Sequence, residues 1–179
     1  QSPVDVVSMR VSDGERVTIE GIDLTAMHTP GHTDDSYCFR MDDRVFTGDT
    51  LLIRGTGRTD FQNGDAGQQY DSLFDGVLKL PVSTLVYPAH DYKGDMVSTI
   101  GEERANNPRL QVGSRAEYIE LMAGLNLPNP KMMDVAVPEN IRMGLNLDRQ
   151  REVATVTPES IIMDNAEGML LVDLREEGE

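Results

Sequence analysis

The sequence predicts an α/β fold in which short strands come first and helices follow. Apolar and polar residues alternate in short runs between residues 4 and 47, which is typical of half-buried strands. From residue 68 onward the apolar residues recur at helical spacing, interrupted by one short apolar run at 84–87. Several strand-like runs lead directly into histidine or aspartate motifs, which indicates a functional site at the strand ends.

The first part of the chain predicts strands joined by turns. Asp13-Gly14 and Asp42-Asp43 are turn sequences, and each lies between two strand-like runs. The predicted strands cover residues 6–9, 17–19, 22–27, 37–41 and 45–47. A glycine-rich loop from Arg54 to Gly67 follows them.

The second part predicts helices around one further strand. A helix is predicted over residues 68–80 because the apolar residues there fall on one face. Pro81 is expected to end it. Those residues are Tyr70, Leu73, Phe74, Val77 and Leu78. The apolar run 84–87 predicts a buried strand that leads to His90. Further helices are predicted over residues 97–106, 115–125 and 138–145.

The composition excludes several classes of function. The formal net charge of -15 opposes general binding to nucleic acid or to an anionic membrane surface. No apolar run reaches the length of a membrane-spanning helix, and no signal peptide is visible. Cys38 is the only cysteine, so no disulfide can form within the chain, and a buried structural thiol is predicted. These features predict a cytoplasmic protein.

All three histidines lie in two short segments that have the composition of a metal site. His28 and His32 flank Thr-Pro-Gly, which predicts a tight turn after a strand. Asp49 and His90 each follow a strand-like run, so imidazole and carboxylate groups are expected to converge from strand ends. His32 is the better-placed ligand, and His28 is expected to support it. For each residue alone the alternative is an ordinary turn or core residue.

The order of these motifs, HTPGH, then FTGD, then YPAHDY, resembles the metallo-β-lactamase superfamily. Three longer segments resemble the persulfide dioxygenases, also called sulfur dioxygenases. They are FTGDTLLIRGTGRTDFQ, VYPAHDYKGDMVSTIGEERANNPRL and LNLPNPKMMDVAVPENIRMG. The resemblance runs from about Val17 to Asn146. It implies the αββα sandwich of the superfamily, of which this chain would represent the C-terminal part.

The resemblance implies one Fe(II) per site, with Zn as the alternative metal. The family's ligands are a histidine matching His32, an aspartate matching Asp49 and a histidine of an H-x-H-x-D-H motif. That motif occurs nowhere in these 179 residues. The 179 residues alone are therefore expected to bind metal weakly and to have no turnover. His90 matches the superfamily's second metal position and is expected to act beside the iron without being a main ligand.

The resemblance also implies a reaction. The intact protein is expected to oxidise glutathione persulfide with O2 to sulfite and glutathione, with His90 and Tyr92 as catalytic residues of this chain. Arg58, Tyr92 and Arg109 match residues that line the family's substrate pocket, and a guanidinium suits the carboxylates of glutathione. Asp60 is placed to anchor Arg58 or its loop. For each arginine the alternative is a solvated surface charge.

A second domain is predicted beyond a charged linker. Residues 1–146 form the metallo-β-lactamase-like domain, without its N-terminal part, and residues 147–155 form the linker. Residues 156–179 resemble the start of a rhodanese-like domain, with a helix start at Thr157-Pro158. A sulfurtransferase module suits a dioxygenase because both handle sulfane sulfur. The sequence leaves a homo-oligomer open.

Two other functions stay open. A hydroxyacylglutathione hydrolase of the glyoxalase II type shares the short motifs and uses two metals, although the GRTDFQ and LNLPNPK segments argue against it. A non-catalytic remnant that serves as a binding module would also lack the third ligand motif. The chain begins at Gln1 rather than at a methionine, and this favours a truncated enzyme over the remnant.

Overall fold

The computed structural model describes residues 9–61, 63–92, 94–128, 135 and 138. By its internal contacts the chain divides into two units, Gln1–Asn129 and Pro130–Glu179. All elements described below belong to the first unit. The predicted linker and rhodanese-like segment, residues 147–179, lie outside the described residues, as does most of the helix predicted over 138–145.

A mixed sheet forms the framework of the first unit. In the described residues it has six strands, which follow one another across the sheet in sequence order. They are β1 (Arg16–Ile19), β2 (Ile22–His28), β3 (Tyr37–Arg40), β4 (Arg44–Gly48), β5 (Leu85–Pro88) and β6 (Ser98–Thr99). Each neighbouring pair is antiparallel except β4 and β5, which are parallel. The carboxyl ends of β4 and β5 therefore lie at one edge of the sheet, where Asp49 and His90 follow.

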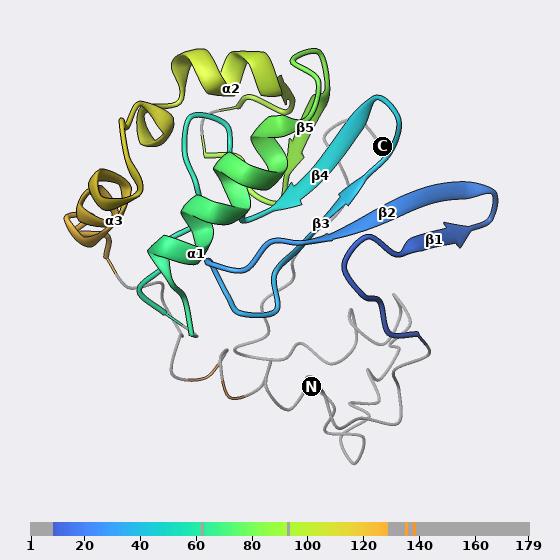
Figure 1. Cartoon of the computed structure of the whole chain (residues 1–179), viewed down its shortest axis with the longest axis horizontal. Coiled ribbons are helices and arrows are strands. Elements are labelled where there is room, and N and C mark those ends of the chain that lie inside the picture. Colours follow the sequence, from blue (N-terminus) through green and yellow to red (C-terminus); the bar gives the residue numbers. More distant parts are fainter. Residues whose placement is uncertain (1–8, 62, 93, 129–134, 136–137, 139–179) are drawn as a thin grey trace, which may run out of the picture. The chain divides into compact units, whose positions relative to one another are not determined.

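Helical segments connect β4 to β5 and follow β6, and helices cover one side of the sheet (Figure 1). Their bounds are α1 (Ala66–Asp71), η1 (Ser72–Gly76), η2 (Val77–Lys79), α2 (Ile100–Asn106), η3 (Pro108–Leu110) and α3 (Arg115–Ala123). Between β4 and β5, α1 continues into the π-helical η1 and the 3-10 turn η2. Asp65, Thr99 and Ser114 begin α1, α2 and α3, because each side chain accepts a hydrogen bond from the backbone N–H three residues further on.

The core lies between the helices and one face of the sheet. Alternate residues of the strands point into it and meet the apolar stripes of the helices. Its fully buried members are Cys38, Val45, Leu51, Leu73, Val77, Val86, Ile100 and Tyr118. This packing agrees with the mixed α/β fold predicted from the sequence.

The other face of the sheet carries aromatic side chains. Tyr37 and Phe39 stack along β3 with ring centroids 6.4 Å apart, and Phe46 and Tyr87 pair between β4 and β5 at 5.7 Å. These rings alternate with core residues, so they point away from the helices. Phe46 is 40% exposed. In the described structure this apolar face is thus only partly covered, as expected of one half of an αββα sandwich.

One predicted turn is confirmed, and one predicted helix start is wrong. The turn predicted at Asp13-Gly14 is present, and Gly14 there has a φ of 74°. The hairpin turn between β1 and β2 lies at Glu20-Gly21, between the strands predicted at 17–19 and 22–27. Both turn residues have positive φ, 50° and 86°, which is the requirement of a type I′ turn. The helix expected to start at residue 97 starts at Ile100, because Ser98-Thr99 pairs with β5. Of the strand predicted at 6–9 only Met9 is described, and it lies outside any strand.

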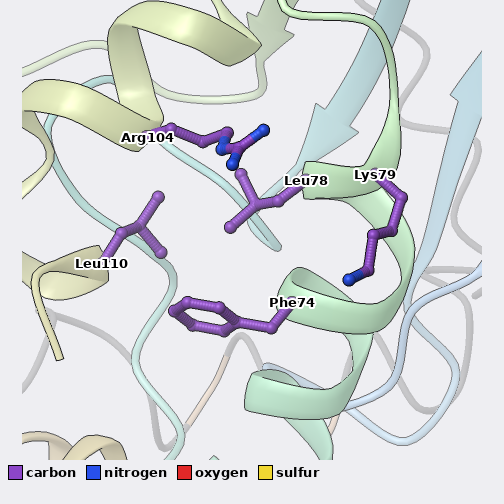
Figure 2. Close-up of a pocket in the computed structure, with 5 residues that line it drawn as sticks. All are labelled: Phe74, Leu78, Lys79, Arg104 and Leu110. Atoms are coloured by element: carbon purple, nitrogen blue, oxygen red, sulfur yellow. The ribbon is translucent and has the colours of Figure 1, made fainter. Parts of the chain in front are cut away.

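A cavity of about 360 Å³ lies among η1, η2, α2 and η3 (Figure 2). Phe74, Leu78 and Leu110 form its apolar walls, and Lys79 and Arg104 stand at its edge. Within the described part of the chain, none of the five side chains is hydrogen-bonded or ion-paired to the histidines or to the aspartate of the predicted metal site. None of the five lining residues belongs to the site predicted from the sequence.

A buried carboxylate ties the loop after β4 to α2. Glu103 is fully buried, and it accepts hydrogen bonds from the guanidinium of Arg54 at 2.6 Å and from its backbone N–H at 2.8 Å. The Ser98 hydroxyl and the Asn107 amide donate to the same carboxylate at 2.6 and 2.8 Å. Each carboxylate oxygen has two donors, so the charge is compensated and the loop is fixed.

The replacement Glu103→Ala is expected to lower the free energy of unfolding by about 3 kcal/mol, because it leaves the partly buried Arg54 guanidinium and two polar side chains without their acceptor. Urea unfolding followed by circular dichroism measures this loss. The control is the neighbouring Glu102, whose side chain is 56% exposed and lies 2.9 Å from Arg54. Glu102→Ala is expected to cost about 1 kcal/mol or less. Equal losses for the two variants would contradict the prediction.

Candidate metal centre

The turn that carries His32 depends on a glycine. Gly31 has a φ of 142°, and a Cβ placed on it would lie 2.3 Å from the Cβ of Gln69 in α1. The Gly31 carbonyl accepts a hydrogen bond from the Asp65 N–H at 2.8 Å. The turn therefore packs against the start of α1 with no room for a side chain, and His32 follows in a fixed place.

Asp49 leaves the sheet at the end of β4, after Gly48, which has a φ of 53°. Across the parallel pair of strands, the Ala89 N–H donates to the Gly48 carbonyl at 3.0 Å. This bond holds the end of β5, and with it His90, beside Asp49. The parallel pairing of β4 and β5 is thus what brings two residues 41 positions apart into contact.

The Asp49 carboxylate lies between two histidines. Its Oδ2 is 3.5 Å from Nε2 of His32, and its Oδ1 is 2.6 Å from Nδ1 of His90. The side chains of His32 and Asp49 are 26% and 22% exposed, and that of His90 is 53% exposed. The structure therefore brings together the three residues predicted for the metal site, in a place that solvent reaches.

The second ring nitrogen of His32 is bound to the backbone. Nδ1 lies 2.7 Å from the carbonyl oxygen of Arg58, and a carbonyl can only accept, so Nδ1 carries the proton of the neutral ring. The lone pair of Nε2 then faces Asp49. Histidines that bind metals usually donate their other N–H to a carbonyl or a carboxylate in this way. An imidazole nitrogen and a carboxylate oxygen in this arrangement fit Fe or Zn.

These side chains do not complete a metal site among the described residues. No group of three or more His, Cys, Asp and Glu side chains in that part of the chain has an arrangement that could hold an ion. His90 donates its Nδ1–H to the Asp49 carboxylate, which can only accept, and this bond orients the carboxylate.

Residues 56–58 form the wall against which His32 packs. A Cβ on Gly57 would lie 2.2 Å from the carbonyl oxygen of Asp49 and 2.9 Å from Nδ1 of His32. The Gly57 N–H donates to the Asp49 carbonyl at 2.7 Å. Glycine is therefore required for the loop to approach both candidate ligands this closely.

The Arg58 guanidinium is engaged within the chain. It donates to both carboxylate oxygens of Asp60 at 2.7 Å, and it lies 3.7 Å from the ring centroid of Phe61. The hydrogen bonds with Asp60 raise the pKa of Arg58, and they lower the pKa of Asp60 below its ordinary value. Of the two roles expected for Asp60, it anchors Arg58. The substrate contact predicted for Arg58 stays a prediction.

The other two predicted substrate residues differ in access. Arg109 is half-buried and donates to the carbonyl and the hydroxyl of Thr56, and burial lowers its pKa. Tyr92 is 78% exposed, and its ring stacks on His90 with centroids 6.0 Å apart. Tyr92 therefore lies beside the candidate centre and open to solvent, whereas Arg109 supports the loop through Thr56.

Comparison with known proteins identifies the family. The sequence matches the family model described as the metallo-beta-lactamase superfamily over residues 2–90. The structure is similar to the crystal structure of ETHE1 from Myxococcus xanthus, with a TM-score of 0.75 and 51% sequence identity over 78% of this chain and 62% of that one. The chain belongs to the metallo-β-lactamase superfamily.

Two proteins are similar to this chain in sequence, and one of them carries a narrower description. Persulfide dioxygenase ETHE1 of Homo sapiens, named as mitochondrial, is 45% identical over 139 residues, which are 76% of this chain and 54% of that protein. An uncharacterized protein of Mycobacterium tuberculosis is 40% identical over 122 residues, which are 64% of this chain and 52% of that protein. The chain thus spans about half the length of these relatives. The predicted resemblance is confirmed, and the rhodanese-like start stays a prediction.

Among the described residues, the side chains of His28 and Cys38 have partners other than the candidate ligands. Nε2 of His28 is 2.9 Å from the carbonyl of Asp34, and its ring packs on Tyr37 at 5.0 Å. His28 therefore supports the turn, as the sequence predicts. The Cys38 sulfur is buried 3.3 Å from the Thr29 hydroxyl, and burial raises the pKa of this thiol. It is a structural cysteine.

Two buried polar residues beside the centre were not predicted. Gln69 and Tyr118 are fully buried, and the Tyr118 hydroxyl donates to the Gln69 Oε1 at 2.8 Å. The Gln69 Nε2 donates to the carbonyl of Gly57 at 3.1 Å. The available signal was helical spacing, since Gln69 lies four residues before Leu73 on the apolar face of the helix.

The replacement Gly57→Ala is expected to lower the free energy of unfolding by about 2 kcal/mol and to displace His32, because the new methyl group meets a backbone carbonyl and the ring. Urea unfolding measures the first effect, and the 15N shifts of the His32 ring report the second. The control is Gly55→Ala, whose Cβ would meet only the Leu52 Cβ at 3.9 Å. The prediction fails if both variants keep native stability and native His32 shifts.

The Tyr118 hydroxyl predicts a loss of stability in alkaline solution. Burial raises its pKa to about 12, whereas the ordinary value is about 10. The unfolded chain loses this proton first, so stability that is complete below pH of about 10 falls by up to about 3 kcal/mol as the pH rises to about 12. Urea unfolding across this range is expected to show the fall in the native protein and in Tyr70→Phe. In Tyr118→Phe this contribution should be absent, and an unchanged slope would refute it.

Proposed function

We propose that this chain is part of the catalytic domain of a persulfide dioxygenase. In the intact protein, glutathione persulfide, O2 and one water would give sulfite and glutathione. Similarity to persulfide dioxygenase ETHE1 at 45% identity supports the proposal. The observation that carries it is the pair of His32 and Asp49, whose Nε2 and Oδ2 lie 3.5 Å apart at the end of β4.

His32 and Asp49 are proposed to hold one Fe(II), together with a histidine of an H-x-H-x-D-H segment outside these 179 residues. Bound there, the metal would supply a Lewis acid with open positions for substrate and O2. The Arg58 carbonyl orients the His32 ring, and His90 orients the Asp49 carboxylate. The 179 residues alone are proposed to bind Fe(II) weakly and without turnover, because a site with two of three ligands loses affinity and geometry.

Of the three proposed substrate contacts, Tyr92 has the side chain that is most exposed to solvent. Its ring stacks on His90 and is 78% exposed, so it can line the approach of the glutathione chain. Arg58 and Arg109 are proposed to supply positive charge for an anionic substrate, against a formal net charge of -15. The Asp60 carboxylate already accepts two hydrogen bonds from the Arg58 guanidinium. A substrate carboxylate would have to displace Asp60 to form the same bidentate pair with Arg58.

The wider setting follows from the same proposal. The described residues contain no helix that is long and apolar enough to cross a membrane. A cytoplasmic location is proposed from the single cysteine, which is buried and reduced. Residues 156–179 are proposed to begin a rhodanese-like sulfurtransferase module, which would exchange sulfane sulfur with the dioxygenase.

One observation favours a rival function, that of a glyoxalase II-type hydrolase. The Asp49 carboxylate contacts a histidine through each of its oxygens, and this arrangement would also suit a carboxylate shared by two metals. A hydrolase of this kind would hold two metals per site, release a hydroxy acid from its glutathione thioester and consume no O2.

Oxygen uptake and metal content test the proposal. The 179-residue chain is compared with the same chain extended upstream by a segment that carries H-x-H-x-D-H, and each is supplied with Fe(II) and glutathione persulfide. The extended protein is expected to hold one iron, consume O2 and release sulfite, whereas the shorter chain stays at the background rate. In the extended protein, His32→Ala and Asp49→Ala should each lower O2 uptake by roughly 100-fold or more.

The control is Asp43→Ala, which removes an exposed aspartate paired with its neighbour Arg44 and should keep native uptake. Normal iron occupancy after replacement of both His32 and Asp49 would overturn the proposal. Two metals per site together with thioester hydrolysis and no O2 uptake would establish the hydrolase instead.

A further inference from the structure

Three consecutive backbone carbonyls in the wall of the candidate metal centre are each bound by a different side chain. The carbonyls belong to residues 56–58, and their donors, in chain order of the carbonyls, are Arg109, Gln69 and His32. Of these donors, Gln69 is fully buried and is itself held by Tyr118. The wall therefore connects the His32 ring to a polar pair inside the protein.

We propose that Gln69 and Tyr118 are positioning residues for His32. Through the carbonyl of Gly57 they fix the next carbonyl, that of Arg58, and so keep the ring proton of His32 on Nδ1. This leaves Nε2 free to bind the metal. The inference rests on the proposed function only in so far as His32 is a metal ligand, because the position of the ring proton does not depend on the reaction.

The chemistry of the acceptors determines the direction of the hydrogen bonds that link Tyr118, Gln69 and Gly57. A carbonyl can only accept, so the Gln69 amide must turn Nε2 toward Gly57, 3.1 Å away. Its Oε1 then faces Tyr118, whose hydroxyl donates over 2.8 Å. Tyr118 therefore holds the amide in the one orientation that supports the loop.

Burial makes these bonds hard to replace. Gln69 and Tyr118 are 0% exposed and Thr56 is 2% exposed, so bulk water does not reach the amide or the hydroxyl. A buried polar atom that loses its partner is destabilising. Loss of either side chain is therefore expected to move the loop or the amide, and the Arg58 carbonyl moves with them.

Two acceptors compete for the single proton of the neutral His32 ring. The Arg58 carbonyl lies 2.7 Å from Nδ1, and the Asp49 Oδ2 lies 3.5 Å from Nε2. The nearer acceptor holds the proton on Nδ1. If the loop withdraws, the carboxylate draws the proton to Nε2, and that nitrogen is no longer free for a metal.

Long-range 1H–15N spectra of the histidine rings test this inference on the metal-free, 15N-labelled 179-residue chain, at a pH where the same spectra show neutral rings. The chain has three histidines, so His32 is assigned by comparison with His32→Gln. The native His32 is expected to show one tautomer, with the proton on Nδ1. Tyr118→Phe and Gln69→Met are expected to lose this single form and to show protonated Nε2.

Tyr70→Phe is the matched control. The ring of Tyr70 lies 5.7 Å from that of Tyr118, and its hydroxyl has no hydrogen bond among the described residues. This variant removes a hydroxyl from the same aromatic cluster and should leave the His32 spectrum unchanged. A change as large as that of Tyr118→Phe would overturn the inference, because it would assign the effect to packing.

The double variant Tyr118→Phe/Gln69→Met separates positioning from folding. Replacing both partners by apolar groups of similar shape leaves neither side chain with an unmatched polar atom, and the Gly57 carbonyl keeps the Thr56 hydroxyl as a donor at 3.3 Å. Thermal unfolding near the native temperature is therefore expected. His32 should still show a mixture of tautomers. A native His32 spectrum in the folded double variant would overturn the inference. Absence of persulfide oxidation by the extended protein would contradict the proposed function alone, since these spectra require neither metal nor substrate.

Discussion

The hydrogen bond from Nδ1 of His32 to the carbonyl of Arg58, at 2.7 Å, joins the two halves of the candidate centre. On one side is the turn after β2, and on the other is the loop after β4 that begins with Asp49. Gly57 lets these segments approach each other, since any side chain there would meet both. The orientation of the His32 ring therefore depends on a backbone group that is held in place.

The loop between β4 and α1 gains its fixed shape from the helices. Glu103 and Asn107 bind its first part, and Gln69 binds its second part. Among the described residues no buried side-chain nitrogen or oxygen lacks a hydrogen-bond partner. A fully satisfied buried network favours one conformation, because any alternative would leave polar atoms unpaired. The helices thus contribute to the centre although none in the described structure carries a candidate ligand.

The strands and the metal motif could be predicted because their signals are local. Alternating apolar residues locate β2 to β4, and a short apolar run locates β5. Asp49 stands directly after β4. The partners of buried polar residues have no local signal: the helical period places Gln69 inside, but its partner Tyr118 lies 49 residues further on. Glu102 and Glu103 are neighbouring residues of the same type, yet the Glu102 side chain is exposed and the Glu103 side chain is buried. The helix start at residue 97 was misplaced because Ser98 and Thr99 pair with β5, and this pairing has no signal in the local sequence.

The pairing of Gln69 with Tyr118 also limits how this interior can diverge. Exchange of one residue for an apolar side chain would leave the other with an unmatched polar atom in a dry environment. Exchange of both leaves no such side-chain atom, and the Gly57 carbonyl keeps the Thr56 hydroxyl as a donor. Related sequences that differ here are therefore expected to have changed at both positions together. Related proteins would then divide into those that support the loop with a hydrogen-bonded polar pair and those that support it with two apolar side chains.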